Sequence, residues 1–169
     1  MAALAGWLCL AHVGAAADDK KDSGDRDFVK KASAAGLAEV NLSNLAVRLS
    51  GNAKVRAFAE RMIVDHGKAN EELLMLANRK QFTAAEKMDS KHTELRDKLA
   101  KMTGAAFDHA FMEGMVKDHE EAVKLFETQS KDGQDAALKS WAGNKLPALK
   151  KHLKMAQDIA KTVKGKSER

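Results

Sequence analysis

Two histidine-containing segments of this chain repeat the same pattern 53 residues apart. Each reads Phe-x3-Met-(Ile/Val)-x-Asp-His-x2-Ala, from Phe58 to Ala69 and from Phe111 to Ala122. At the helical period the Phe, Met, His and Ala of each segment share one face, which places His66 and His119 on apolar stripes. A titratable ring in such a stripe needs a hydrogen-bond partner or a ligand. The pattern therefore predicts a binding centre between helices, and it does not identify what is bound.

Two further polar residues lie on apolar helical faces. Glu39 is the only charged residue in a stripe that runs from Phe28 to Leu49, and His152 lies near the edge of a stripe in the last helical segment. A buried carboxylate must pair with a cation, bind a metal or keep its proton. Each long helix thus offers one candidate ligand, and the predicted set is Glu39, His66, His119 and His152.

A transition metal is one use for this set, because imidazoles with a carboxylate suit zinc, iron, manganese or copper. Asp65 and Asp118 would orient the rings as outer hydrogen-bond acceptors. Met62 and Met115, one turn before the histidines, would add sulfur and favour copper. In the alternative interpretation the methionines fill the core, and Glu39 and the histidines form a buried polar network without metal. Non-covalent haem held by histidine and methionine is a third possibility.

The elements that position these residues are predicted to be helices. The chain is 44% hydrophobic and 5% aromatic, with one proline and no tyrosine, a composition that favours an all-α fold. Thr83 and Glu86 form a capping-box pattern for a short helix, and Pro147 lies inside the last one. The predicted fold is a four-helix bundle with a short fifth helix in the crossover. The expected helices span residues 28–50, 52–80, 84–102, 104–131 and 135–163.

Four segments divide the chain. Residues 1–17 contain an apolar run that ends in three alanines, which predicts a signal peptide cleaved after Ala17 and a periplasmic or secreted protein. Residues 18–27 are charged and predicted to be a disordered tether, residues 28–163 form the bundle domain, and residues 164–169 form a basic tail. The only cysteine, Cys9, leaves with the leader, so thiolate ligands and covalently attached haem are excluded from the mature chain.

The formal net charge of +5 restricts the expected partners. A solvent-exposed helix face explains most of the excess, and weak contact with anionic envelope surfaces explains the rest. Nucleic acid is not expected without interleaved aromatic residues, and no transmembrane segment is expected in the mature chain. No nucleophile–base set or phosphate loop indicates an enzyme. The basic residues concerned are Lys150, Lys151, Lys154, Lys161, Lys164, Lys166 and Arg169.

Several short motifs, taken together, resemble one known family over about residues 27 to 160. They are Asp27-Phe28, Gly36-Leu37-Ala38-Glu39-Val40, Phe58-Ala59, Met62, Asp65-His66, Gly104-Ala105-Ala106-Phe107-Asp108, Asp118-His119-Glu120, Leu125-Phe126, Leu146-Pro147 and His152-Leu153. The chain resembles the exported bacterial domain-of-unknown-function family 4142, which is placed in the ferritin-like superfamily. The resemblance implies a four-helix bundle in the periplasm or outer membrane. The Met-x3-His block is also similar to a related ferritin-like family with a suspected role in copper handling.

One departure from the ferritin-like pattern limits what the resemblance implies. Di-iron sites of that superfamily use Glu-x-x-His on two helices, whereas the residues three before the histidines are Ile63, Val116 and Leu149. A di-iron oxidase centre and ferroxidase activity are therefore not expected. The predicted function is an exported bundle that binds a transition metal for metal handling or envelope stress. The alternative is a non-catalytic structural or interaction module of the cell envelope.

Overall fold

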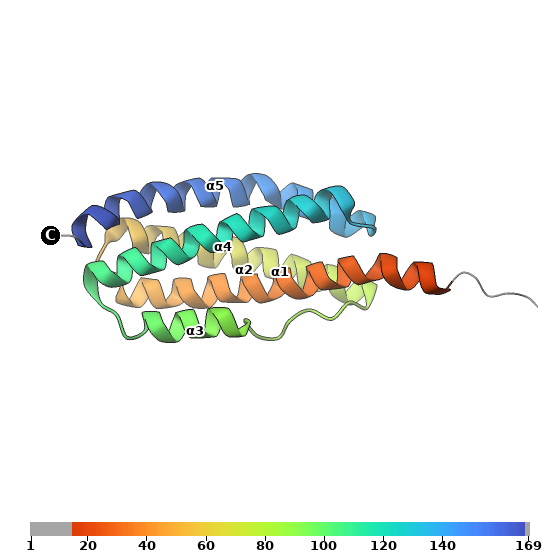
Figure 1. Cartoon of the computed structure of the whole chain (residues 1–169), viewed down its shortest axis with the longest axis horizontal. Helices are drawn as coiled ribbons and strands as arrows, with labels where there is room; N and C mark the ends of the chain where they lie inside the picture. The colour runs from red at the N-terminus through yellow and green to blue at the C-terminus, as the bar shows by residue number, and fades with distance from the viewer. Residues whose placement is uncertain (1–14, 168–169) are drawn as a thin grey trace, which may run out of the picture.

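The computed structural model describes the backbone of residues 15–167 and the side chains of residues 23–163. This part of the chain forms five helices and no strand, which confirms the all-α prediction (Figure 1). Most of the predicted signal peptide and the end of the predicted basic tail lie outside the described residues. The helices are α1 (Ala15–Leu49), α2 (Ala53–Lys80), α3 (Ser90–Leu99), α4 (Gly104–Asp132) and α5 (Ala136–Ser167).

Two antiparallel hairpins build the bundle. Helix α1 packs most extensively against α2, and α4 packs most extensively against α5, while α1–α4 and α2–α5 contacts join the hairpins. Helix α3 contacts α1 and α4 and lies in the connection between the hairpins (Figure 1). The bundle with a short helix in its crossover therefore matches the sequence-based expectation.

The predicted start of the short helix is wrong. Helix α3 begins at Ser90, where the Asp89 side chain accepts a hydrogen bond from the backbone N–H of His92. The preceding segment is held against α1 instead of coiling, because the Ser33 hydroxyl accepts a hydrogen bond from the backbone N–H of Ala85 at 2.7 Å. Phe82 is also buried in the core. These long-range contacts override the local capping-box pattern at residues 83–86.

The disordered tether expected over residues 18–27 also differs from the structure, in which these residues belong to α1. Asp25 is buried, and one of its oxygens accepts a hydrogen bond from the Gln129 side chain at 2.7 Å. Its carboxylate also accepts from the backbone N–H groups of Gln134 and Asp135, at 3.2 and 2.6 Å. The start of α1 is therefore tied to the connection between α4 and α5.

A layer of buried polar side chains separates two apolar clusters of the core. One cluster includes Leu42, Phe58, Met62, Phe111 and Met115. The other lies nearer the α4–α5 connection and includes Phe28, Leu73, Phe126, Leu138 and Leu149. Between them lies a set of buried polar residues that we term the polar layer. Its buried members are Glu39, His66, His92, Asp118, His119 and His152.

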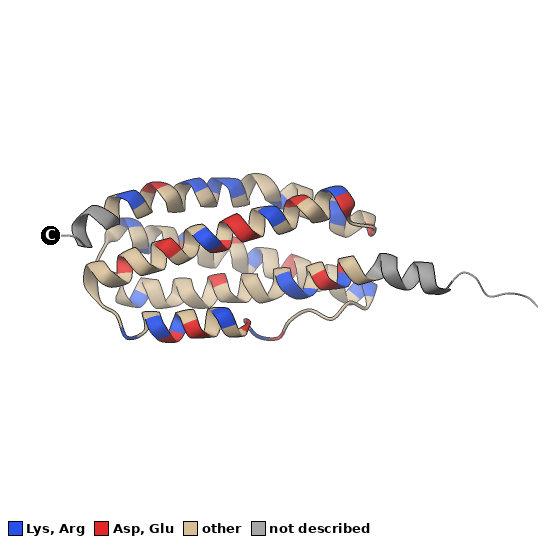
Figure 2. Cartoon of the chain, viewed as in Figure 1, with Lys and Arg blue, Asp and Glu red and all other residues tan. Residues whose placement is uncertain are grey.

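Helix α5 continues through Pro147 and exposes basic residues on its outer face (Figure 2). Lys150, Lys151, Lys154 and Lys161 are all exposed, as expected for a solvated face. Within the described residues, none of the helices has the length and the apolar character that crossing a membrane would require.

Replacing Asp25 with alanine should lower the free energy of unfolding by about 2–3 kcal/mol, because three hydrogen-bond donors lose a charged acceptor. Urea denaturation followed by circular dichroism measures the effect. The control is Asp27→Ala on the same helix, which removes only an exposed ion pair with Lys31 and should cost less than about 1 kcal/mol. Equal stabilities of the two variants would contradict the anchoring role of Asp25.

Candidate metal centre

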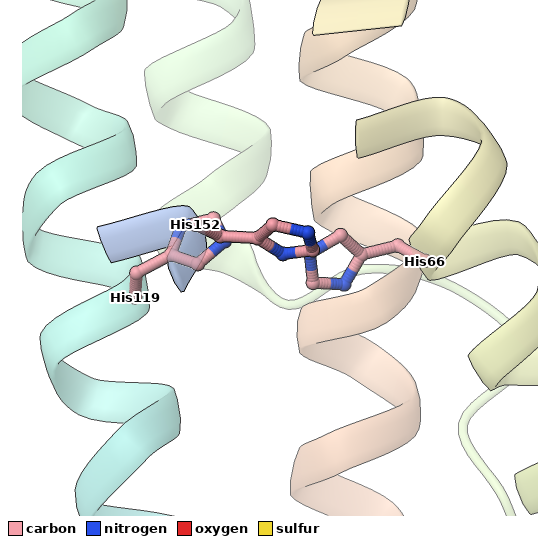
Figure 3. Close-up of side chains that lie close together, drawn as sticks. All are labelled: His66, His119 and His152. Carbon is pink, nitrogen blue, oxygen red and sulfur yellow. The ribbon is translucent and has the colours of Figure 1, made fainter. Parts of the chain in front are cut away.

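Three histidines from three helices meet in the polar layer. The rings of His66 on α2, His119 on α4 and His152 on α5 point toward one another (Figure 3). Their ring centroids are 5.4 Å apart for His66 and His119, 5.5 Å for His66 and His152, and 5.6 Å for His119 and His152. One nitrogen of each ring lies within 4.8 Å of the corresponding nitrogens of the other two. The structure thus brings together three of the four predicted ligands.

Hydrogen bonds fix the tautomers of two of these rings. The Nδ1 atom of His119 lies 2.9 Å from the backbone carbonyl oxygen of Met115, which can only accept, so Nδ1 donates. The Nε2 atom of His152 lies 2.9 Å from a carboxylate oxygen of Asp65 and donates in the same way. In a neutral ring the other nitrogen then carries a lone pair. These other nitrogens, His119 Nε2 and His152 Nδ1, are buried and have no hydrogen-bond partner among the described residues, and neither has His66 Nε2.

The three rings are neutral near pH 7. Burial, and to a smaller extent the neighbouring His119 and His152, lower the pKa of His66 to about 3. Burial also lowers the pKa of His119 and of His152. Neutral imidazoles are the form that coordinates metals, so no proton has to be displaced before an ion can bind.

Glu39 lies beside the cluster rather than in it. Its Oε1 atom is 3.4 Å from His119 Nδ1, the nitrogen that faces away from the other rings' unpartnered atoms. Burial raises the pKa of Glu39 well above its ordinary value, and the nearby Asp118 carboxylate raises it further. Burial therefore favours the neutral form of Glu39. The predicted fourth ligand is placed next to one ring and outside the group of converging nitrogens.

Of the two predicted outer acceptors, Asp65 contacts one of the predicted rings and Asp118 does not. Asp65 accepts a hydrogen bond from His152 across the bundle and a second from Arg61 on its own helix. Burial alone would raise the pKa of Asp65, but these two hydrogen bonds lower it. The carboxylate is therefore ionised and suited to orient and polarise the His152 ring.

Asp118 turns toward α3 instead of toward the three converging rings. Its Oδ1 atom lies 3.3 Å from His92 Nε2 and 3.3 Å from the Lys91 ammonium. The Asp118 carboxylate, which accepts a hydrogen bond from His92, raises the pKa of His92, and His92 also contacts Asp89 at 2.7 Å. This buried pairing was missed at the sequence level, and the only signal for it was a histidine on the apolar face of a short helix.

Met62 and Met115 are fully buried in the apolar cluster that contains Phe58 and Phe111. Met115 reaches the histidine cluster through its backbone carbonyl group, which accepts from His119. This placement supports core filling for both side chains.

A cavity of about 490 Å³ adjoins the cluster, and we refer to it as the central cavity. His66 and His152 line one end, and Trp141 lines the other. At Gly36, an added Cβ would lie 1.9 Å from the Oδ1 atom of Asn70, and both residues line the cavity. Further small residues keep the interior open. They are Ala32, Ala35, Ala69 and Ala122.

A family model described as a domain of unknown function (DUF4142) matches residues 11–159, and the chain belongs to this family. No curated protein and no solved structure matches the chain. The family assignment agrees with the resemblance seen in the sequence motifs.

Replacing His66 with glutamine should make the protein less sensitive to acid. Between pH 6.5 and the folded-state pKa of about 3, the unfolded chain binds a proton at residue 66 that the folded protein does not, so stability falls as the pH is lowered. Lowering the pH from 6.5 to 4.5 reduces the free energy of unfolding of both proteins. The reduction should be about 2 kcal/mol smaller in the variant than in the original protein. Urea denaturation at the two pH values, in buffer with a chelator, measures the difference.

Glu39 acts in the opposite direction, because its raised pKa makes the folded state bind the extra proton, but this contribution is common to both proteins. The control is His109→Gln on the surface of α4, where the ring contacts only Glu113 at 3.6 Å. His109→Gln should keep the original pH dependence. An identical dependence in the His66 variant would show that His66 is not buried in its neutral form.

Proposed function

We propose that this DUF4142 protein binds one transition-metal ion between α2, α4 and α5 through His66 Nε2, His119 Nε2 and His152 Nδ1. The observation that supports the proposal is the convergence of three buried nitrogens that lack any hydrogen-bond partner in the described structure. Leaving one buried polar atom unsatisfied costs about 1–3 kcal/mol. Three such atoms gathered from three helices are better explained by a shared ligand than by packing.

The donor set restricts the kind of ion. Three neutral imidazole nitrogens, without thiolate or ionised carboxylate, suit zinc, copper or another late transition metal and disfavour magnesium and calcium. With both methionines in the apolar core, sulfur gives no reason to prefer copper, so zinc serves as the test ion. Two nitrogens on one zinc ion lie about 3.3 Å apart, since each Zn–N bond is about 2.0–2.1 Å. The rings would therefore have to move closer on binding.

Residues around the cluster would prepare it for the ion. The Asp65 carboxylate and the Met115 carbonyl oxygen accept the N–H groups of His152 and His119, which fixes both rings with their lone pairs toward the centre. Such outer contacts raise the basicity of a metal-bound imidazole. Three protein ligands also leave a coordination position for a molecule from the central cavity, which is the pattern of open metal sites.

The role that fits such a site is metal handling in the cell envelope, in a chain exported by its signal peptide. The competing function is a structural module in which the histidines only pack against one another. The edge-to-face contact of His119 with Phe58, at 6.3 Å between ring centroids, and the Glu39–His119 contact favour that alternative. The two functions differ in whether the protein binds metal, which a direct titration decides.

Titration of zinc into protein purified without a chelating tag should show one tight equivalent by isothermal titration calorimetry. Removing one ligand, in His66→Ala, should weaken the affinity at least 100-fold, because a three-nitrogen site becomes a two-nitrogen site. His119→Ala and His152→Ala should behave alike. The matched control is His109→Ala, which should bind zinc as the original protein does. Circular dichroism verifies that each variant is folded, and equal zinc binding by all four variants would refute the site.

Asp65→Asn should retain zinc binding with about 10- to 100-fold lower affinity, because the amide accepts a hydrogen bond from His152 without its negative charge. The exposed Asp158, which pairs with Lys154 at 3.0 Å, provides the control variant Asp158→Asn. Competition with a chromogenic chelator measures both affinities. An Asp65 variant that matches the control would argue against a role for Asp65 in orienting a ligand.

A further inference from the structure

The central cavity has an apolar half that the metal site does not use. This half is lined by Leu73, Phe126, Trp141 and Leu149, which come from α2, α4 and α5. The Trp141 indole is held in place by a hydrogen bond from Nε1 to Glu72, at 3.0 Å. The volume of about 490 Å³ falls within the range of small-molecule sites, about 300–1,000 Å³. The space therefore suits a molecule with an apolar body.

Two of the residues with an unpartnered buried nitrogen also line the cavity. His66 and His152 both line the cavity, and both are more than nine-tenths buried. Their free lone pairs can accept a hydrogen bond or bind a cation, but they repel an anion. A molecule that occupies the whole cavity must therefore meet either these lone pairs or an ion that they hold.

The charges around the cavity show which head group such an ion would favour. Most carboxylates in the lining have a cationic partner, since Asp65 pairs with Arg61, Asp118 and Glu121 with Lys91, and Asp89 with His92. Glu39 contacts His119, and one oxygen each of Glu39 and Asp118 has no hydrogen-bond partner among the described residues. A divalent ion on three neutral imidazoles would add two positive charges next to one carboxylate that accepts from a ring of the cluster, Asp65. Lys68 also lines the cavity and forms no salt bridge among the described residues. The excess positive charge calls for an anionic ligand.

We propose that the central cavity binds an amphipathic organic carboxylate, with its head group at the His66–His152 end and its apolar body against Leu73, Phe126 and Trp141. This inference rests on the proposed function, because the bound ion supplies the charge that holds the head group. The ligand class is a monocarboxylate with an aliphatic or aromatic body, whether free or released from a lipid.

The test uses the full chain with Trp7→Phe, in which Trp141 is the only tryptophan and reports on the cavity. Hexanoate, octanoate, decanoate and decanol are titrated into zinc-loaded protein below their aggregation concentrations, with Trp141 fluorescence and calorimetry as readouts. Each additional pair of methylenes should tighten binding about ten-fold. Decanol should bind at least ten-fold more weakly than decanoate, and removing zinc with a chelator should weaken decanoate at least ten-fold.

Two variants fill the cavity with a larger side chain, Ala69→Leu on α2 and Ala35→Leu on α1. If one of them fails to fold, the other still tests the inference. Both should weaken decanoate at least ten-fold when compared at full zinc occupancy. Ala57→Leu, at an exposed position of α2, is the matched control and should bind decanoate normally. Equal binding by the filled variants and the control would place the fatty acid on the surface and overturn the inference.

The remaining outcomes separate this inference from the proposed function. Zinc binding without decanoate binding, or equal affinities for decanoate and decanol, would overturn the carboxylate ligand and leave the metal site intact. A failure of zinc to bind is measured directly in the zinc titration, with no carboxylate present, and would refute the proposed function. Decanoate affinity that is the same with and without zinc would refute the metal-assisted recognition of the head group.

Discussion

The structure of this bundle is constrained by the free-energy cost of burying polar atoms in its middle without hydrogen-bond partners. Three imidazole nitrogens without partners would together cost several kcal/mol, a large part of the roughly 5–15 kcal/mol by which a typical domain is stable. The apolar clusters on either side offset this cost by burying phenylalanine, leucine and methionine side chains. A bound ion would recover part of it, so folding and metal binding would be thermodynamically coupled.

The polar layer separates into two electrostatic systems with different roles. Asp118, His92 and Lys91 form an ion-paired group that attaches α3 to α4. The three converging histidines remain neutral, and burial raises the pKa of Glu39 beside them. Helix α3 thus supplies the cations that compensate Asp118, and the histidine cluster is left without a compensating anion except for Asp65.

Helical periodicity predicted the fold and identified Glu39, His66, His119 and His152 as residues on buried faces, because burial follows directly from the face that a residue occupies. It failed for the pairings between helices. Asp65 is adjacent to His66 in sequence but contacts His152, since consecutive residues of a helix point in directions about 100° apart. Asp25 lies in a charged segment whose composition predicts disorder. Its hydrogen-bond partners are more than 100 residues away in sequence, so local composition could not reveal them. Glu39 was placed at the correct level of the bundle but on the far side of a ring.

The glycine at position 36 has an effect on cavity size that extends beyond α1. A methyl group there would collide with the Asn70 amide, which also lines the cavity, so the Asn70 side chain would have to move. The capacity of the interior therefore depends on a residue that contributes no donor and no charge. Replacing Gly36 with alanine would change which ligands fit into the cavity without replacing any of the three histidines.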